Sequence, residues 1–265
     1  MTWLRTLLVL LFLGKAASLS AGDDFCGLRN LAFEAGESVT LYVYYTWLGV
    51  YVYGGDAVFN VSLDHMNGKP VYHVIGDGKT NSFFDGIFKV RDRYESYIDT
   101  ATLRPVKFIR NVDEGGYKVY ENVSFNAAAN TATTTKGLYS TPPCVQDVLS
   151  AIYYARNIDF NSYQAGDKIP FDMFLDDQTY HLYIRYLGKE VVTTRYGKFH
   201  AIKFKPLLIK GTMFQGGEGM TVWVSDDRNH VPLRIESPIV VGSVKVDMMR
   251  YRHLRYPLTA FMGLR

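Results

Sequence analysis

Alternating apolar and polar residues recur along most of this chain. The clearest runs are T-L-Y-V-Y-Y-T-W at residues 40–47 and D-A-V-F-N-V-S-L at residues 56–63. Such alternation, rich in aromatic and β-branched residues, predicts strands with one buried face. Asn67-Gly68 and the segment D-E-G-G at 113–116 separate neighbouring runs, and both tolerate the positive φ of a tight hairpin turn. About a dozen such runs, without alternating helices, predict a mainly β, antiparallel fold.

One segment breaks the alternation and predicts a helix over residues 143–157. Thr141 or Pro142 is expected to start it, because proline suits the first helical turn. Six residues then follow the spacing of a single helix face, and five of them are apolar or aromatic. They are Val145, Val148, Leu149, Ile152, Tyr153 and Arg156.

The first 21 residues are typical of a secretory signal peptide. Arg5 precedes an unbroken apolar run at 7–13, and small residues follow it. The run is shorter than the roughly 20 residues needed to cross a bilayer, so we expect no transmembrane segment. These features predict a periplasmic protein cleaved near 18–21, with a single all-β domain over 22–265. The alternative is a buried amino-terminal helix.

Charge gives no indication of a nucleic-acid partner. The chain has 29 basic and 26 acidic residues. Arg5 and Lys15 belong to the predicted signal peptide, which leaves 27 basic against 26 acidic residues. A nearly neutral mature chain without a basic stripe does not predict phosphate binding.

Two cysteines in an exported protein predict one disulfide, between Cys26 and Cys144. The bridge would attach the start of the predicted helix to the amino-terminal segment. The alternative is a pair of free thiols, with Cys144 activated at the helix start.

Sequence motifs that carry chemistry are weak. The six histidines are scattered, and neither a C-x-x-C nor an H-E-x-x-H motif occurs, so we predict no metal site. Residues 76–80 (G-D-G-K-T) look like the end of a phosphate-binding loop, but position 73 is histidine where that motif needs glycine. Asp176-Asp177 and Asp226-Asp227 lie between predicted strands, where aspartate supports turns. We therefore expect no catalytic residues, no cofactor and no enzymatic activity.

The aromatic residues are the remaining signal. The chain has 20 Tyr and 16 Phe, and several aromatics crowd residues 42–53. They indicate either an ordinary sheet core or an apolar groove between a sheet and the helix, because Tyr offers a flat apolar face with a polar tip. The candidate ligand-binding residues are Tyr42, Tyr44, Trp47, Val148, Leu149, Ile152, Tyr153 and Trp223.

Four stretches together resemble a known family. They are F-E-A-G-E-S-V-T-L-Y-V-Y-Y-T-W (33–47), F-D-G-I-F-K-V-R-D-R-Y-E-S-Y-I-D (84–99), P-P-C-V-Q-D-V-L-S-A-I-Y-Y-A-R (142–156) and V-W-V-S-D-D-R-N-H-V-P-L-R-I-E (222–236). They resemble domain-of-unknown-function family 3108, exported proteins of Gram-negative bacteria. That family has no established activity and supplies no catalytic residues.

The hairpin at 223–236 is also similar to one in periplasmic lipoprotein carriers. In those proteins a large antiparallel sheet forms a half-barrel, helices fill its concave face, and the cavity takes acyl chains. The resemblance implies a half-barrel or open barrel here, with the single helix packed on the concave face.

Three functions remain open. The first is a non-enzymatic binding module for an apolar or lipid-like ligand. The second is a structural or protein-interaction component of the cell envelope with a filled core. The third is an enzyme that the motifs do not reveal. A well-formed cavity lined by Tyr42, Trp47 and the helix would favour the first over the second.

Overall fold

The computed structural model describes residues 26–47, 50–210, 216–239 and 242–264. The predicted signal peptide lies outside these residues. The described strands are β1 (Ser38–Trp47), β2 (Val50–Met66), β3 (Lys69–Thr80), β4 (Val90–Asp99), β5 (Pro105–Glu114), β6 (Tyr117–Asn126), β7 (Thr131–Thr133), β8 (Leu138–Ser140), β9 (Lys168–Leu175), β10 (Gln178–Thr193), β11 (Lys198–Pro206), β12 (Thr221–Ser225), β13 (Pro232–Pro238), β14 (Ser243–Arg252) and β15 (Phe261–Gly263). The helices are α1 (Ser82–Asp85), α2 (Val148–Ala155) and a 3-10 turn at Phe160–Ser162. Within the described ranges, no helix has the length and apolar character needed to cross a membrane.

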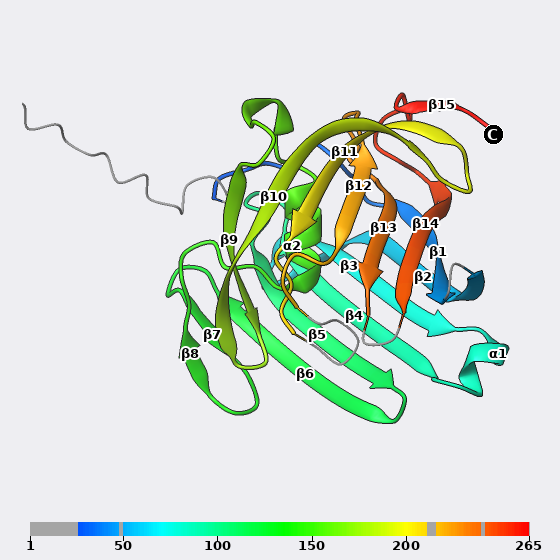
Figure 1. Cartoon of the computed structure of the whole chain (residues 1–265). Helices are drawn as coiled ribbons and strands as arrows, with labels where there is room; N and C mark the ends of the chain where they lie inside the picture. The colour runs from blue at the N-terminus through cyan, green and yellow to red at the C-terminus, as the bar shows by residue number, and fades with distance from the viewer. Residues whose placement is uncertain (1–25, 48–49, 211–215, 240–241, 265) are drawn as a thin grey trace, which may run out of the picture.

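The strands form one curved antiparallel sheet, which confirms the predicted fold class. Strands β1 to β8 pair with their sequence neighbours, as do β9 to β14. The two series join where β1 pairs with β14, and β15 adds to β11. The predicted hairpin turns are present, with positive φ at Asn67-Gly68 and at Gly115-Gly116. Figure 1 shows α2 inside the curve of this sheet.

Side chains bring the two edges of the sheet together. The edge strands of the ordered path are β8 and β9. The Phe174 ring of β9 packs against Phe125 at 6.1 Å and Tyr139 at 5.7 Å between ring centroids. Beyond β9, the Asp177 carboxylate lies 2.7 Å from the Lys136 ammonium. The curve therefore closes through packing and an ion pair.

Helix α2 begins later than residue 143, so the predicted start at Thr141 or Pro142 is wrong. Cys144 has a φ of +60°, which no helical residue adopts. The backbone of Gln146 then pairs with β9, donating to the Asp172 carbonyl at 2.9 Å. Asp147 caps the helix by accepting from the Ser150 amide at 2.8 Å. Pairing with β9 uses the backbone groups that an earlier helical turn would need.

The buried arc of α2 also differs from the predicted stripe. Leu149 and Tyr153 are buried, as predicted, but Ile152 is 39% exposed. Tyr154, outside the predicted stripe, is 1% exposed: it belongs to the central core, and its hydroxyl accepts from the Leu28 amide at 3.1 Å. The amino-terminal segment covers this side of α2, a contact that helical periodicity alone does not indicate.

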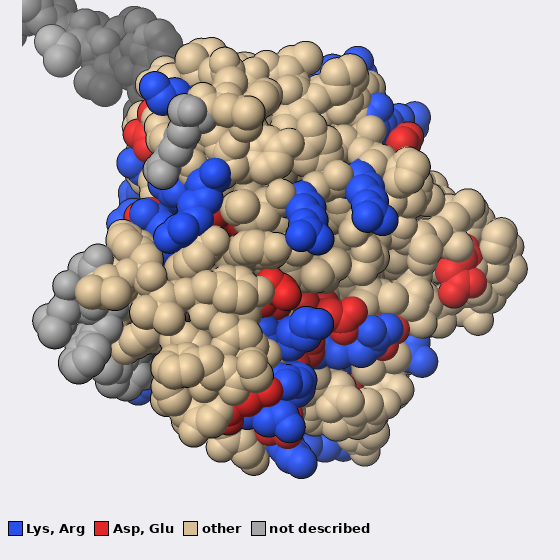
Figure 2. Space-filling view, turned by 90° about the vertical axis from the view of Figure 1, so that its right-hand side faces the viewer, with Lys and Arg blue, Asp and Glu red and all other residues tan. Residues whose placement is uncertain are grey.

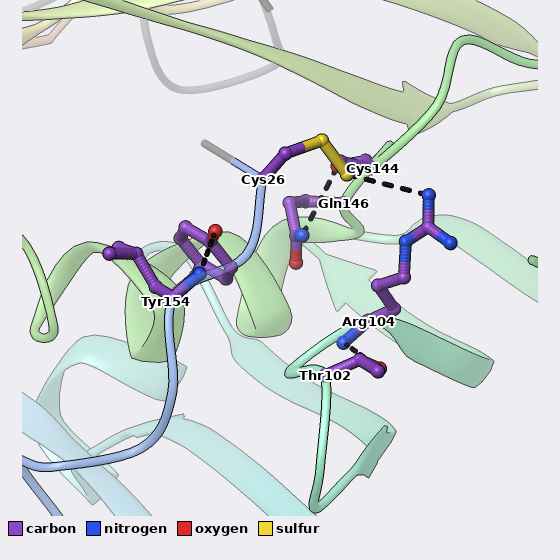
Figure 3. Close-up of a disulfide and its surroundings, with 7 residues drawn as sticks. Cys26, Thr102, Arg104, Cys144, Gln146 and Tyr154 are labelled. Atoms are coloured by element: carbon purple, nitrogen blue, oxygen red, sulfur yellow. Dashed lines mark hydrogen bonds between the residues drawn. A yellow bond between two sulfur atoms is a disulfide. The ribbon is translucent and has the colours of Figure 1, made fainter. Parts of the chain in front are cut away.

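The predicted disulfide between Cys26 and Cys144 is present (Figure 3). It joins residues 118 positions apart in the sequence, with their Cα atoms 5.5 Å apart. The Arg104 guanidinium lies 3.4 Å from the Cys144 sulfur, and the Gln146 side-chain amide donates to the Cys144 carbonyl. The bridge attaches the amino-terminal segment just before α2.

A buried ion pair holds the other end of α2. The Arg156 guanidinium donates to both oxygens of Glu37, at 2.5 and 2.8 Å. It also donates to the Asn229 carbonyl at 3.1 Å, and both charged side chains are almost fully buried. The helix is thus fixed to the start of β1 and to the turn that precedes β13.

The central core surrounds α2. Its members come from the amino-terminal segment, the helix and both series of strands. They include Phe33, Val61, Val74, Leu149, Tyr153 and Ile184. Large buried side chains on both sides of the helix leave it enclosed along most of its circumference.

Candidate functional site on the concave face

The register across the sheet identifies the concave face. Residues that oppose one another on neighbouring strands share a face, and one such row is Phe59, Gly76, Tyr94 and Arg110. Leu149 of α2 lies against Gly76, where an added Cβ would be 3.4 Å from its methyl group. Ser96, on the same side of β4 as Tyr94, donates to Asp147 at 2.6 Å. This side of the sheet therefore carries the helix.

A group of apolar residues on and around this face keeps solvent access. We call it the concave apolar surface, and it comprises Phe59, Tyr94, Ile152, Phe171, Met220 and Ile235. Five of these are half-buried and pack against the central core, while Ile152 is exposed. On a helix, positions 152 and 154 point in nearly opposite directions. Ile152 therefore faces away from the amino-terminal segment that covers Tyr154.

A pair of carboxyl groups lies farther along the same face. Asp92 is two residues from Tyr94, and Glu114 lies diagonally across on β5. Burial, together with the nearby Glu114 charge, raises the pKa of Asp92 to about 7. Asp92 also accepts from the Asp113 amide at 3.3 Å. A carboxyl group that is partly buried beside another negative charge retains its proton to higher pH than a free carboxyl group does.

A second carboxyl group on this face has a structural role. Burial raises the pKa of the Asp147 carboxyl to about 6, but this side chain caps α2 and bonds to Ser96. Among the described residues, no three His, Cys, Asp or Glu side chains are grouped as metal ligands would be. The arrangement places half-buried apolar side chains on the same face as a carboxyl group with a raised pKa.

A small cavity lies at the opposite end, beside the disulfide. Its volume is about 10 Å³, and Arg104, Phe125, Cys144 and Val145 are among its lining residues. That volume corresponds to roughly one water molecule. It is too small for an organic ligand, and its lining includes neither Tyr42 nor a residue of α2, so it is not the cavity that would have favoured a binding module.

The family model for a protein of unknown function, DUF3108, matches residues 40–249. The chain belongs to the DUF3108 family. This confirms the resemblance seen in the sequence. None of the curated proteins compared with the chain matches it.

Solved structures resemble this DUF3108 chain in fold. A β-barrel-like protein of family DUF1849 from Brucella abortus superposes with a TM-score of 0.57 at 8% identity, covering 86% of this chain and 99% of the other. An exported protein with a YmcC-like fold from Bacteroides fragilis has a TM-score of 0.33 at 11% identity, covering 85% and 100%. A lipoprotein from Parabacteroides distasonis has a TM-score of 0.32 at 13% identity, covering 84% and 100%. The first supports a barrel-like fold and nothing beyond it.

Of the helix residues proposed as ligand contacts, only Val148 and Ile152 have accessible side chains in this DUF3108 fold. Leu149 and Tyr153 are each 2% exposed and belong to the core. Val148 is half-buried and packs against the cluster around Phe174. Ile152 is the one that solvent reaches best.

The structure places the predicted tyrosines on the other face of β1. Tyr42 and Tyr44 alternate with Leu41 and Val43, so they point away from the concave face. Both rings pack against Tyr53, at 5.2 and 6.0 Å between centroids. The expectation that these tyrosines line a groove with the helix is therefore wrong, because the alternation of β1 turns them to the opposite face of the sheet, where Tyr44 is buried beneath the Arg195 guanidinium.

The two predicted tryptophans do not join the helix site either. Trp223 belongs to a different core cluster from α2, and its indole N–H donates to Glu190 at 2.6 Å. The Lys203 ammonium lies 5.3 Å from the Trp223 ring centroid. Strand β1 ends at Trp47, whose side chain lies outside the described part of the chain.

Sequence reasoning missed most of the concave apolar surface of this DUF3108 member. Phe59 and Tyr94 alternate correctly within their strands, but their face could be assigned only once α2 was placed. Gly76 and Gly78 offered a local signal, because glycine inside a strand often marks close approach of another element. Here Gly76 is where Leu149 of the helix contacts the sheet.

Proposed function

We propose that this protein is a non-enzymatic binding module for an apolar, acyl-chain-like ligand in the periplasm. The observation that carries the proposal is the concave apolar surface, which combines half-buried apolar side chains from several strands with the exposed Ile152 of α2. The disulfide supports an oxidising compartment. The resemblance of the hairpin at 223–236 to one in periplasmic lipoprotein carriers supports the class of ligand.

The packing restricts where such a ligand can lie. Leu149 and Tyr153 are buried against the sheet and against Phe33, so a ligand cannot pass beneath the helix without displacing them. It would instead lie along the open side of α2, covering Ile152, Met220 and neighbouring apolar atoms. Each buried CH₂ group then contributes about 0.8 kcal/mol before ordering costs are subtracted.

The exposed area of Ile152 gives an estimate of the binding free energy that one ligand contact contributes. An isoleucine side chain offers roughly 140 Å² of apolar area, of which 39% is exposed here. Covering that fraction contributes about 1.4 kcal/mol, or roughly tenfold in affinity.

The test begins with the natural ligand. Native mass spectrometry of the mature protein, purified from an export-competent bacterial host, should show a bound mass that extracts into organic solvent. Titration of delipidated protein with cis-parinaric acid should then show saturable binding. Ile152→Gln should weaken probe binding about tenfold. Val191→Gln, at an exposed apolar position on β10, is the matched control and should leave it unchanged.

A second candidate follows from the packed helix. Because Leu149 and Tyr153 are almost fully enclosed, the fold is also compatible with an envelope interaction protein that has a filled core. A clean apo mass from folded protein, together with no probe binding, would favour that function. Ile152→Gln and Val191→Gln would then both show no binding of the probe.

A further inference from the structure

One end of the half-barrel presents three chain reversals side by side. They are the β1–β2, β3–β4 and β5–β6 connections. The register places them together, because Gly55 opposes Thr80 and Glu114 opposes both Val90 and Tyr117. We call this the α1 end, defined as the described residues within 50–56, 79–92 and 113–118. It lies at the right and lower right of Figure 1.

Exposed apolar side chains concentrate at the α1 end. Sixteen large apolar residues of the described chain are exposed, and eight of them lie here. They are Val50, Tyr51, Val52, Tyr53, Phe83, Ile87, Phe88 and Tyr117. Phe83 and Ile87 are 68% and 69% exposed, so they contribute little to the core. Concentrations of this kind mark interaction sites rather than ordinary surface.

Basic and acidic side chains at the α1 end differ in their exposure to solvent. All exposed charged side chains in the defined ranges are basic: Lys79, Lys89, Arg91 and Lys118. The acidic side chains of the same ranges are all partly buried: Asp56, Asp85, Asp92, Asp113 and Glu114. Figure 2, which faces this side, shows a band of mixed charge with wide uncharged areas around it. Arg91 is paired with Asp85, and Lys118 with Asp113. Among the described residues of these ranges, the exposed cations outside an ion pair are therefore Lys79 and Lys89.

The tip that carries Phe83 and Ile87 is held in place by its own contacts. Asn81 caps α1 by accepting from the Phe84 amide at 3.0 Å. Asp85 accepts from both terminal nitrogens of Arg91, at 2.9 and 2.7 Å. The Phe84 ring packs against Tyr45 at 6.1 Å between centroids. The exposed side chains thus project from an ordered support.

We propose that the α1 end docks on a bilayer surface that contains anionic phospholipid. Exposed aromatic and aliphatic side chains beside Lys and Arg are the combination that partitions into a lipid interface, where apolar groups enter the acyl boundary and the cations meet headgroups. The apolar groups project from three neighbouring chain reversals, an arrangement that suits a planar partner. The role of this docking rests on the proposed function. Docking at the α1 end would bring the Tyr94 side of the concave face towards the lipid that supplies an acyl ligand.

The test uses the mature full-length chain and two kinds of vesicle. Co-sedimentation is measured with phosphatidylcholine alone and with phosphatidylcholine containing roughly one-third phosphatidylglycerol. The protein should bind the anionic vesicles several-fold better, and high salt should reduce that binding. Failure to bind the anionic vesicles overturns the proposal.

Two variants locate the contact. Phe83→Ser combined with Ile87→Ser should weaken partition into anionic vesicles at least about tenfold. The matched control combines Leu138→Ser with Val191→Ser, exposed apolar positions outside the α1 end, and should bind like the parent. Equal binding by both variants overturns the assignment of the surface. If sedimentation velocity instead shows a parent dimer that the α1-end variant makes monomeric, the surface is a self-association interface and the proposal fails.

Failure here can be distinguished from failure of the proposed function. Parinaric acid binding is measured without vesicles in the same proteins. Vesicle binding without probe binding supports docking and overturns the ligand proposal. Probe binding without vesicle binding supports the ligand proposal and overturns docking. The Ile152→Gln variant should lose affinity for the probe while its partition into vesicles stays unchanged.

Discussion

Removing the Cys26–Cys144 bridge should cost much of the stability of this fold. The bridge joins residues 118 positions apart. For a loop of this length, the chain-entropy model gives about 5 kcal/mol of stabilisation, through restriction of the unfolded chain. Stabilities of whole domains are typically about 5–15 kcal/mol, so the loss should be a large fraction of the total.

The perturbation is the double variant Cys26→Ser, Cys144→Ser. Position 144 has a φ of +60°, and serine carries the same backbone strain there as cysteine, so that strain cancels in the comparison. Urea unfolding should show a lower midpoint in the variant. Its m-value should rise, because an unfolded chain without the cross-link exposes more surface.

A loss below about 2 kcal/mol would refute the entropic reasoning. It would mean that the denatured chain is already compact, or that other contacts hold the amino-terminal segment against α2. The Leu28 amide, which donates to the Tyr154 hydroxyl, distinguishes these cases. If its hydrogen exchange stays slow in the variant, the segment is held without the bridge.

Three further predictions use buried charge and close backbone contact. Glu37→Gln leaves its buried arginine partner without a counter-charge and should destabilise the fold by about 3–5 kcal/mol in urea unfolding, whereas a loss under about 1 kcal/mol would contradict the role of the pair. Because the pKa of Asp92 is raised to about 7, above its unfolded value, the folded state binds more protons and stability should fall as pH rises from about 4 to about 7. Asp92→Asn should flatten that slope except for the parts contributed by Asp147 and Glu121, whose pKa values burial also raises. An unchanged slope in the unfolding midpoints at several pH values would exclude Asp92 as the cause. Gly55→Ala would place a Cβ into the facing backbone of β3 and should cost more than about 2 kcal/mol, while Gly78→Ala meets only a side chain at 3.8 Å and should be tolerated; equal melting temperatures would contradict the pairing of β2 with β3 in this register.

The parts of the fold that depend on local order were predictable from sequence. Alternation identified the strands because each has one buried face, and Asn67-Gly68 identified a turn because both residues adopt positive φ there. The Cys26–Cys144 bridge followed from the presence of only two cysteines in a chain with an export signal. None of these inferences required knowing which elements meet in space.

The boundaries and buried arc of α2 could not be obtained in the same way. Residues 143–147 have helical spacing, but the backbone of Gln146 pairs with β9, and that pairing requires the edge of a sheet to be nearby. Helical spacing favoured Ile152 over Tyr154 as a core residue. The amino-terminal segment, more than a hundred residues away along the chain, decides that Tyr154 is buried and Ile152 is exposed.

Dependence on contacts between distant elements also explains why the predicted and observed candidate sites differ. Crowding of aromatic residues at 42–53 indicated a binding surface, yet Tyr42 and Tyr44 point away from the concave face because Leu41 and Val43 take the inward positions of β1. The aromatic excess therefore has two destinations. Some rings, such as Tyr94, remain on the concave face, and others, such as Tyr51 and Phe83, are exposed at the α1 end. The two proposals together give this protein two kinds of lipid contact: a bilayer surface at the α1 end, and a single acyl chain on the concave face.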